Sequence, residues 1–346
     1  MAPDFERFLT TVRRGTPDRV PPCELSVDTP IKELFLGRPI RTPQDDIEFW
    51  LRAGYDYVIV STPGQPVSDV VTHEPGSGEQ AEATHDHRWA VSGTGAVPNW
   101  EKFETYPWVT EAEVNYGPVD FLRDLLPDGM LAIANQGPLF SGAWRLMGLE
   151  AFSYALVEAP ELVAAIFEKL GELSVKITKA NCQKEWVGAV WLGDDIAFAS
   201  TLMTSPAVFR QYALPYYRRI GEVCREYRKP LIFHSDGNVL PVIDELIDVA
   251  GISALHPIEP KAMDIQQVKR DYGHRVALIG NVDVDLLSQG TPEMVAAETK
   301  RLLRDVAPDG GYLLGSSNSI TYYTRLENYR AMLETLRKFG GYPIHG

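Results

Sequence analysis

The stretch "KPLIFHSDGNVLPVIDEL" (residues 229–246) joins an apolar, β-branched run to a segment whose apolar residues recur at helical spacing. The first half predicts a buried strand, and the second half predicts a helix. His234, Asp236 and Gly237 lie where the strand ends. Polar residues at such a junction can hold a metal ion, transfer a proton or cap the helix, so the surrounding architecture has to decide between these roles.

The same strand-then-helix pattern recurs along the chain of 346 residues. Apolar runs predict eight strands, at residues 20–26, 55–61, 130–136, 187–195, 230–236, 252–257, 275–283 and 311–319. Strands that are apolar on both faces and alternate with helices predict an α/β fold with a parallel sheet, here a single (β/α)₈ TIM barrel over residues 1–346. An open doubly wound sheet is the alternative, but the glycine-rich first turn of that fold is missing.

One connection is much longer than the others. Residues 62–128 follow the second predicted strand and include "ATHDHRWAVSGTG" (83–95), whose alternation and glycines predict a β-hairpin. We expect this segment to be an insertion that covers the barrel mouth. We interpret His85 and His87 as part of an exposed turn, because two histidines without a third ligand do not make a metal site.

Composition restricts the partners and the compartment. The net charge of −14 argues against a nucleic-acid or anionic membrane surface, because such partners need a basic face. No apolar run is long enough for a membrane span and no charged-then-apolar start is visible, so we expect neither a membrane span nor a secretory signal. Its cysteines are far apart and form no CxxC pair, which suits a reducing compartment: Cys23, Cys182 and Cys224. We therefore expect a cytoplasmic protein.

In a barrel, the loops that follow the strands meet at one face, and the chemistry is expected there. Polar residues at the predicted strand ends supply the catalytic candidates Glu24, Asp194, His234 and Asp236. Further polar and aromatic residues near these ends are the candidates for binding substrate: Asn135, Trp191, His256, Asn281, Asn318 and Tyr322. We interpret His256 equally well as a filler of the barrel's top layer.

His234 and Asp236 are two residues apart in an extended chain, so their side chains leave the same face and can reach one metal ion. The competing interpretation is that Asp236 caps the following helix. Asp194 and Asp195 are adjacent, so only one of them can point into the barrel. The sequence leaves open which of the two does so.

Several segments carry a more specific resemblance, and together they span nearly the whole chain in order. They are "RRGTPDRVP" (13–21), "GDDIAFASTLMTSPAVFRQYALPYYRRI" (193–220), "FHSDGNVLPVIDELID" (233–248), "ALIGNVDVDLLSQGTPEMVAAETKRLL" (277–303) and "GGYLLGSSNSITYYTRLENYRAM" (310–332). They resemble the uroporphyrinogen decarboxylase superfamily, which also contains cobalamin-dependent methyltransferases. The resemblance implies a (β/α)₈ barrel whose site lies at the carboxyl ends of the strands.

The resemblance favours the methyltransferase branch of this superfamily. Decarboxylases carry an arginine-rich segment of the form "MRQAGRY" after the first strand, and here "CELSVDTPIKELF" (23–35) offers Glu24 and Asp28 but no arginine. Carboxylates repel a substrate that itself bears many carboxylates. In the branch's coenzyme M enzymes, the zinc ligands would fall at His234, Asp236 and Asn318, where only the histidine is retained. Replacing two thiolates by oxygen ligands argues against a thiol acceptor.

We therefore expect a corrinoid-dependent methyltransferase that takes methyl from a small methoxylated or methylated compound and delivers it to a corrinoid cofactor or corrinoid protein. A divalent metal such as zinc, held by His234 and Asp236, or a positioned acid would stabilise the leaving group. Arg145 and Arg325 are the basic residues best placed to contact a substrate carboxylate or a corrinoid, but we interpret both as solvated surface residues. A homodimer is one assembly that this interpretation allows. The alternatives are a carboxy-lyase acting on a tetrapyrrole or another carboxylate, and a non-catalytic homologue that has kept only the barrel.

Overall fold

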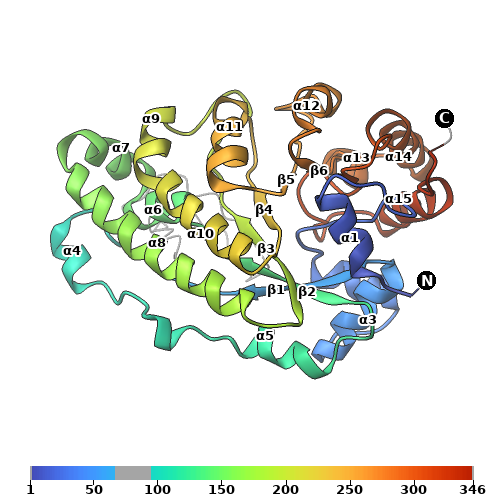
Figure 1. Cartoon of the computed structure of the whole chain (residues 1–346), viewed down its shortest axis with the longest axis horizontal. Helices are drawn as coiled ribbons and strands as arrows, with labels where there is room; N and C mark the ends of the chain where they lie inside the picture. The colour runs from blue at the N-terminus through green and yellow to red at the C-terminus, as the bar shows by residue number, and fades with distance from the viewer. Residues whose placement is uncertain (1, 67–94, 345–346) are drawn as a thin grey trace, which may run out of the picture.

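The computed structural model describes residues 2–66 and 95–344. Seven parallel strands form one sheet, and their order in space follows their order in the chain (Figure 1). The strands are β1 (Tyr57–Thr62), β2 (Leu131–Gln136), β3 (Val187–Gly193), β4 (Leu231–His234), β5 (Ala254–His256), β6 (Ala277–Ile279) and β7 (Tyr312–Leu313). Because each crossover leads to the next strand without reversal, the topology is that of a barrel wall and differs from the doubly wound alternative.

The first predicted strand is wrong as a regular element. Residues 20–27 contact the β7 side of the sheet through isolated parallel bridges, Pro22 to Leu314 and Val27 to Ile320. The adjacent prolines 21 and 22 lack the N–H groups that a ladder requires. On the other side, the Tyr57 hydroxyl of β1 accepts from the Glu24 N–H and donates to the Glu24 carbonyl, both at 2.7 Å. An irregular segment therefore takes the place of the eighth strand.

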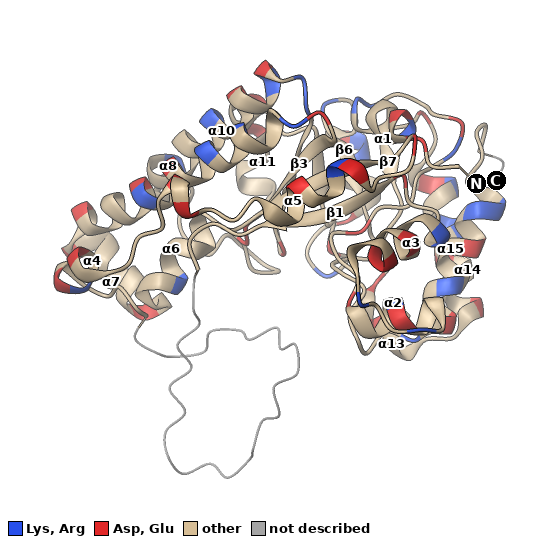
Figure 2. Cartoon of the chain, turned by 90° about the horizontal axis from the view of Figure 1, so that it is seen from below, with Lys and Arg blue, Asp and Glu red and all other residues tan. Residues whose placement is uncertain are grey.

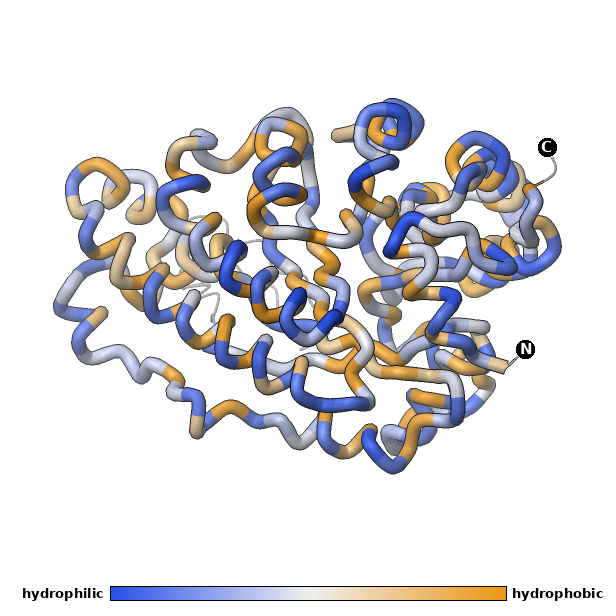
Figure 3. The backbone as a smooth tube through the Cα atoms, in the orientation of Figure 1, coloured by the Kyte–Doolittle hydropathy of each residue, from blue (hydrophilic) through white to orange (hydrophobic). Residues whose placement is uncertain are grey.

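Helices pack outside the sheet, and α8 and α10 show the alternation of apolar and polar turns expected of helices with one buried face (Figure 3). The α-helices are α1 (Phe5–Val12), α2 (Thr29–Leu36), α3 (Pro43–Ala53), α4 (Trp100–Thr105), α5 (Gly117–Phe121), α6 (Phe140–Met147), α7 (Leu149–Glu158), α8 (Pro160–Cys182), α9 (Pro206–Val208), α10 (Leu214–Glu226), α11 (Ile243–Glu245), α12 (Ile265–Tyr272), α13 (Val284–Gln289), α14 (Pro292–Val306) and α15 (Leu326–Phe339). Short 3₁₀ or π segments are η1 (Glu111–Glu113), η2 (Leu122–Asp124), η3 (Phe209–Ala213), η4 (Leu240–Val242) and η5 (Leu246–Ala250).

Local sequence explains where several helices begin. Thr42 caps α3 by accepting from the Asp45 N–H, Asp45 returns a contact to the cap, and a proline occupies the first turn. Thr291 caps α14 by accepting from the Met294 N–H, again directly before a proline. These helix starts agree with the threonine–proline pairs visible in the sequence.

Contacts across the strands show which side chains point into the barrel. Trp191 of β3 and His256 of β5 meet with ring centroids 5.0 Å apart although β4 lies between their strands, so both rings point to the interior. Phe233 of β4 points the other way and packs against Tyr217 of α10, at 5.4 Å. Because side chains alternate along a strand, His234 lies on the interior side with Trp191 and His256.

The described part of the insertion, residues 95–128, begins against α6, where the Val97 N–H donates to the Leu146 carbonyl at 2.7 Å. It ends near the start of β3, where Trp186 Nε1 donates to the Val119 carbonyl at 2.8 Å. This part thus returns the chain to the amino ends of the strands. The predicted hairpin, including His85 and His87, lies outside the described residues.

Acidic and basic residues are interspersed along the outer helices, for example on α8 and α10 (Figure 2). None of the helices in the described ranges combines the length and the apolar character needed to cross a lipid bilayer.

Candidate functional site

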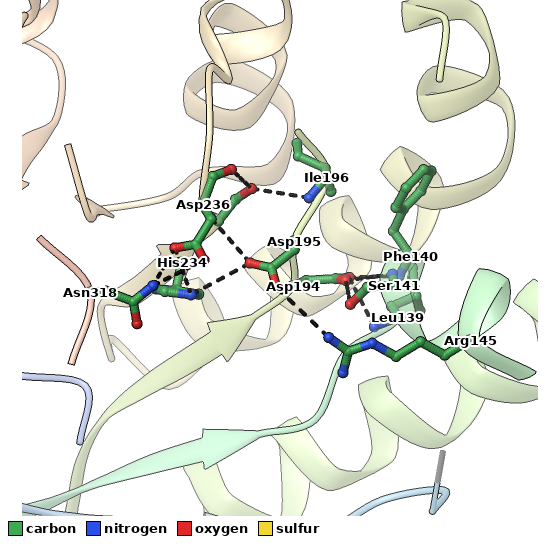
Figure 4. Close-up of polar contacts among 11 residues, drawn as sticks. Leu139, Phe140, Ser141, Arg145, Asp194, Asp195, Ile196, His234, Asp236 and Asn318 are labelled. Carbon is green, nitrogen blue, oxygen red and sulfur yellow. Dashed lines mark hydrogen bonds and ion pairs between the residues drawn. The ribbon is translucent and has the colours of Figure 1, made fainter. Parts of the chain in front are cut away.

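Asp195, His234 and Asp236 come together at the carboxyl ends of β3 and β4 (Figure 4). Nε2 of His234 lies 3.6 Å from Oδ1 of Asp195 and 3.7 Å from Oδ1 of Asp236. One ligand atom from each of these residues lies within 4.8 Å of the others. The His234 side chain is nearly buried, and the two carboxylates are about one-fifth exposed, at 21% and 19%. Within the described residues, part of each carboxylate is therefore exposed to solvent.

The cluster fits a divalent cation. One imidazole nitrogen with two carboxylates is a donor set of the kind that binds catalytic zinc with one position left open, and its oxygen content also suits harder metals. Ligand atoms about 2.0–2.1 Å from a tetrahedral zinc stand roughly 3.3 Å from each other. The two distances from His234 are close to this spacing. The predicted pair of His234 and Asp236 thus gains Asp195 as a third candidate ligand.

Asp236 is held by a neighbour from the far end of the chain. The Asn318 amide nitrogen donates to both Asp236 carboxylate oxygens, at 2.8 and 2.9 Å. Burial raises the pKa of Asp236 to about 6, His234 acts in the opposite direction, and the negative charges of Asp195 and Glu259 add to the rise. A carboxyl group that titrates near neutrality is suited to transfer protons under physiological conditions.

Asp194 does not join the cluster, contrary to expectation. It directly follows β3 and is buried. Its carboxylate faces the start of α6 and accepts hydrogen bonds from the backbone N–H groups of Leu139, Phe140 and Ser141 at 2.6–2.8 Å. The hydroxyl groups of Ser141 and Tyr217 donate to it as well, at 2.9 and 2.5 Å. A negative charge here satisfies unpaired donors at a helix N-terminus. Asp195 therefore takes the position beside His234.

Arg145 also lies at the cluster and is not the solvated surface residue that was expected. It belongs to α6, is about one-quarter exposed, and its Nη2 lies 3.9 Å from Oδ2 of Asp195. Its guanidinium carbon lies 5.4 Å from the centre of the Trp144 ring. The strand pattern did not indicate Arg145, because its position depends on how α6 packs over the end of β3.

Asp195 was the alternative that the sequence left open beside Asp194, whereas Glu259 was not among the candidates. Alternation along β3 could have found Asp195, since Trp191, Gly193 and Asp195 are separated by steps of two. Glu259 follows β5 in an irregular segment, and nothing in its local sequence distinguishes it. Its Oε2 accepts from the Gly237 N–H at 3.0 Å, directly beside Asp236.

Glu24 occupies a different environment. Its side chain is fully buried, and the carboxylate accepts from the N–H and the Oγ–H of Ser316, at 2.7 and 2.6 Å. Burial raises the pKa of Glu24 to about 8. In the part of the chain that the structure describes, no hydrogen bond or ion pair joins Glu24 to Asp195, His234 or Asp236.

Two of the predicted substrate-binding residues, His256 and Trp191, lie in the barrel interior next to His234. Nδ1 of His256 lies 2.8 Å from Nδ1 of His234, and the Trp191 ring packs edge-on against His256. Burial, together with the neighbouring His234, lowers the pKa of His256 well below its usual range. Trp191 Nε1 and His256 Nε2 are buried without a hydrogen-bond partner among the described residues.

The remaining predicted binding residues differ in exposure. Asn281 is buried and donates through Nδ2 to the Ile258 carbonyl at 2.6 Å, which leaves its Oδ1 without a partner among the described residues. Oδ1 of Asn135 is likewise buried without a hydrogen-bond partner among the described residues. Tyr322 is half-exposed, and its N–H donates to Asp28 at 2.8 Å.

Comparison with known proteins agrees with this architecture. Residues 97–339 match the family model described as uroporphyrinogen decarboxylase (URO-D). Uroporphyrinogen decarboxylase from Anaeromyxobacter dehalogenans is 24% identical over 372 residues, which cover 96% of this chain and 99% of that protein. The methylcobamide:CoM methyltransferase MtbA from Methanosarcina acetivorans is 28% identical over 204 residues, 59% of this chain and 56% of that protein.

A solved structure of a methyltransferase from Methanosarcina mazei has the same fold, with a TM-score of 0.72 and 20% identity, covering 96% of this chain and 98% of that one. The family model spans more than half of the chain. This protein therefore belongs to the uroporphyrinogen decarboxylase family, and its similarities extend to the family's methyltransferases.

Proposed function

We propose that this protein is a corrinoid-dependent methyltransferase that takes a methyl group from a small methoxylated or methylated compound. The methyl group would pass to the Co(I) centre of a corrinoid, on a partner corrinoid protein or free in solution. The observation that carries the proposal is the grouping of Asp195, His234 and Asp236 at the carboxyl ends of β3 and β4.

The reaction needs help at its leaving atom. When Co(I) attacks the methyl carbon, the bond from carbon to oxygen or nitrogen breaks, and the bonding electrons remain on the leaving alkoxide or amine. A divalent cation held by Asp195, His234 and Asp236 would supply Lewis acidity at that atom. In the alternative without a cation, Asp236, whose pKa is raised to about 6, would supply the proton that the leaving group takes up. Asn318 would hold the Asp236 carboxyl group in place during this transfer.

The donor atoms argue against a thiol acceptor. The resemblance described above implies that Asp236 and Asn318 occupy the places of the cysteine ligands of the coenzyme M enzymes, and neither residue can supply a thiolate. Oxygen ligands favour harder cations and oxygen or nitrogen substrates. A methyl donor such as an ether or an amine suits the cluster better than a thiol does.

A carboxy-lyase remains the second candidate, because Arg145 lies beside Asp195 and the uroporphyrinogen decarboxylase of A. dehalogenans aligns along 96% of this chain. A tetrapyrrole with many carboxylates needs several cationic contacts. Among the described residues, Arg145 is the basic side chain that forms an ion pair with the cluster. A smaller acid with one carboxylate would fit this arrangement better than a tetrapyrrole.

The deciding experiment measures both reactions on the same preparation. Purified protein is incubated without oxygen with Co(I) cobalamin and a panel of methyl ethers and methylamines, and methylcobalamin is followed by its absorbance. Parallel samples contain uroporphyrinogen or small carboxylic acids, and released CO₂ is measured. We expect methylcobalamin with at least one donor, and its loss in Asp195→Asn. Release of CO₂ without any methylcobalamin would establish the lyase instead.

A further inference from the structure

The two buried histidines of the site are joined directly to each other. Nδ1 of His234 and Nδ1 of His256 lie 2.8 Å apart, with ring centroids at 5.0 Å and ring planes inclined by 30°. Two ring nitrogens at this distance must share a single hydrogen, because one has to donate and the other has to accept. The state of one ring therefore determines the state of the other.

The second nitrogen of His234 faces the carboxylates. Nε2 lies 3.6 Å from Asp195 and 3.7 Å from Asp236, and it can bind a cation only through its lone pair. With a cation there, the hydrogen of the neutral His234 ring has to be on Nδ1, and Nδ1 of His256 has to accept it. The neutral His256 ring then carries its own hydrogen on Nε2.

We propose that His256 is a positioning residue: it accepts the Nδ1–H of His234 and so keeps Nε2 of His234 free to bind a divalent cation together with Asp195 and Asp236. This inference rests on the metal-assisted form of the proposed function. The packing supports it, because the Trp191 ring meets His256 edge-on, at 5.0 Å and 79°, and fixes the plane of the imidazole.

The positions of the hydrogens on the two histidine rings depend on whether a cation is bound at the cluster. Without a cation, the favoured arrangement reverses: Nε2 of His234 keeps a hydrogen facing the two carboxylates, and Nδ1 of His256 donates to His234. Both arrangements place two hydrogens on the two rings, so the change needs no net uptake or loss of protons by the pair. Nε2 of His256, which has no partner among the described residues, changes from an acceptor to a donor.

The test measures zinc affinity of the full-length protein by competition with a chromophoric chelator, with wild type, His256→Phe and His256→Gln. Phenylalanine fills the space but leaves the Nδ1–H of His234 without an acceptor, and we expect affinity to fall about 10–100-fold. The glutamine carbonyl can accept this hydrogen and should restore most of the affinity. Thermal unfolding of each variant shows whether it is folded.

¹⁵N spectra of histidine-labelled protein give a second measurement. In the zinc-bound wild type, the hydrogen of His256 should be on Nε2, and the signal is assigned by its disappearance in His256→Gln. A hydrogen on Nδ1 of His256 in that state would overturn the inference.

The affinity results separate two failures. If wild type binds zinc and His256→Phe binds it equally well, or if both variants are weakened equally, the positioning role of His256 is wrong while the proposed function stands. If wild type binds no zinc, the metal-assisted form of the proposed function fails, and the role of His256 fails with it.

Discussion

The Asn318 amide group donates to both carboxylate oxygens of Asp236, although the two residues are 82 positions apart in the chain. This contact joins the loop after β7 to the end of β4. It holds Oδ1 of Asp236 on the side of the carboxylate that faces Nε2 of His234. Asn318 thus acts through Asp236, even though its position in the resemblance is that of a metal ligand.

Removing this contact should move the titration of Asp236. The Asn318 hydrogen bonds favour the charged carboxylate and lower its pKa, so Asn318→Leu should raise the pKa above about 6. A protonated Asp236 cannot bind a cation. Zinc affinity of the variant should therefore fall about 3–10-fold at pH 6 and change less at pH 8. Affinity measured across this pH range checks the shift, and parallel profiles for variant and wild type would contradict it.

Asp194 and Asp195 provide a matched pair of substitutions. Asp194→Ala removes the acceptor of three backbone N–H groups and two hydroxyl groups, and should lower the free energy of unfolding by about 3 kcal/mol or more. Asp195→Ala should change stability by less than about 1 kcal/mol and abolish tight zinc binding. Urea unfolding and zinc titration of both variants check this separation. If Asp194→Ala abolished zinc binding and Asp195→Ala lowered stability, Asp194 would be the aspartate of the cluster and the assignment of Asp195 would be wrong.

The purified wild-type protein should hold about one divalent ion per chain if the cluster is a metal site. His234→Ala removes the nitrogen ligand and should lose the ion, because two carboxylates alone bind transition metals weakly. Elemental analysis after purification without chelators measures the content. His274→Ala is the control, since His274 is exposed and outside the cluster. Equal metal content in both variants would show that any bound ion lies elsewhere.

Glu24 should make stability depend on pH. Its pKa is raised from 4.5 to about 8 in the folded protein, so the folded state holds a proton that the unfolded state has released. Its contribution to stability is complete below about pH 4.5, declines as pH rises and is lost above about pH 8. Relative to Glu24→Gln, wild type should lose about 1 kcal/mol per pH unit within this window.

Denaturant unfolding of wild type and Glu24→Gln at several pH values measures this difference. The same change at the exposed Glu327 serves as the control and should produce no comparable trend. If the difference between wild type and Glu24→Gln stays constant from pH 5 to pH 8, the buried carboxyl group is already charged and the expected linkage is absent.

Seven of the predicted strand ranges overlap an observed strand, because buried parallel strands are continuous apolar runs; residues 187–195, for example, contain β3. The observed β6 and β7 are much shorter than the predicted 275–283 and 311–319. The prediction failed at residues 20–26, where apolar character was read as a strand despite two prolines that cannot join a ladder. A stricter use of backbone hydrogen-bonding capacity would have corrected this segment.

The candidate site was predicted in part. Four of the predicted residues form a chain of contacts at one barrel face: His256 meets His234, His234 lies near Asp236, and Asp236 accepts from Asn318. The alternation of side chains along β3 could have identified Asp195, which is four residues after Trp191. The position of Arg145 depends on the packing of a helix, which local sequence does not encode. The catalytic and binding roles of all these residues stay predictions, as do the corrinoid partner and the assembly.

All the described hydrogen bonds between β1 and residues 20–27 pass through the hydroxyl group of Tyr57. Elsewhere in the sheet, neighbouring strands are joined by backbone hydrogen bonds, whereas β1 is joined to residues 20–27 through one tyrosine hydroxyl group. Local unfolding of the barrel should therefore start between β1 and residues 20–27, away from β4. It should expose the buried Glu24 before it disturbs the contact between His234 and His256. Amide hydrogens flanking Tyr57 should exchange with solvent sooner than those of β3 and β4.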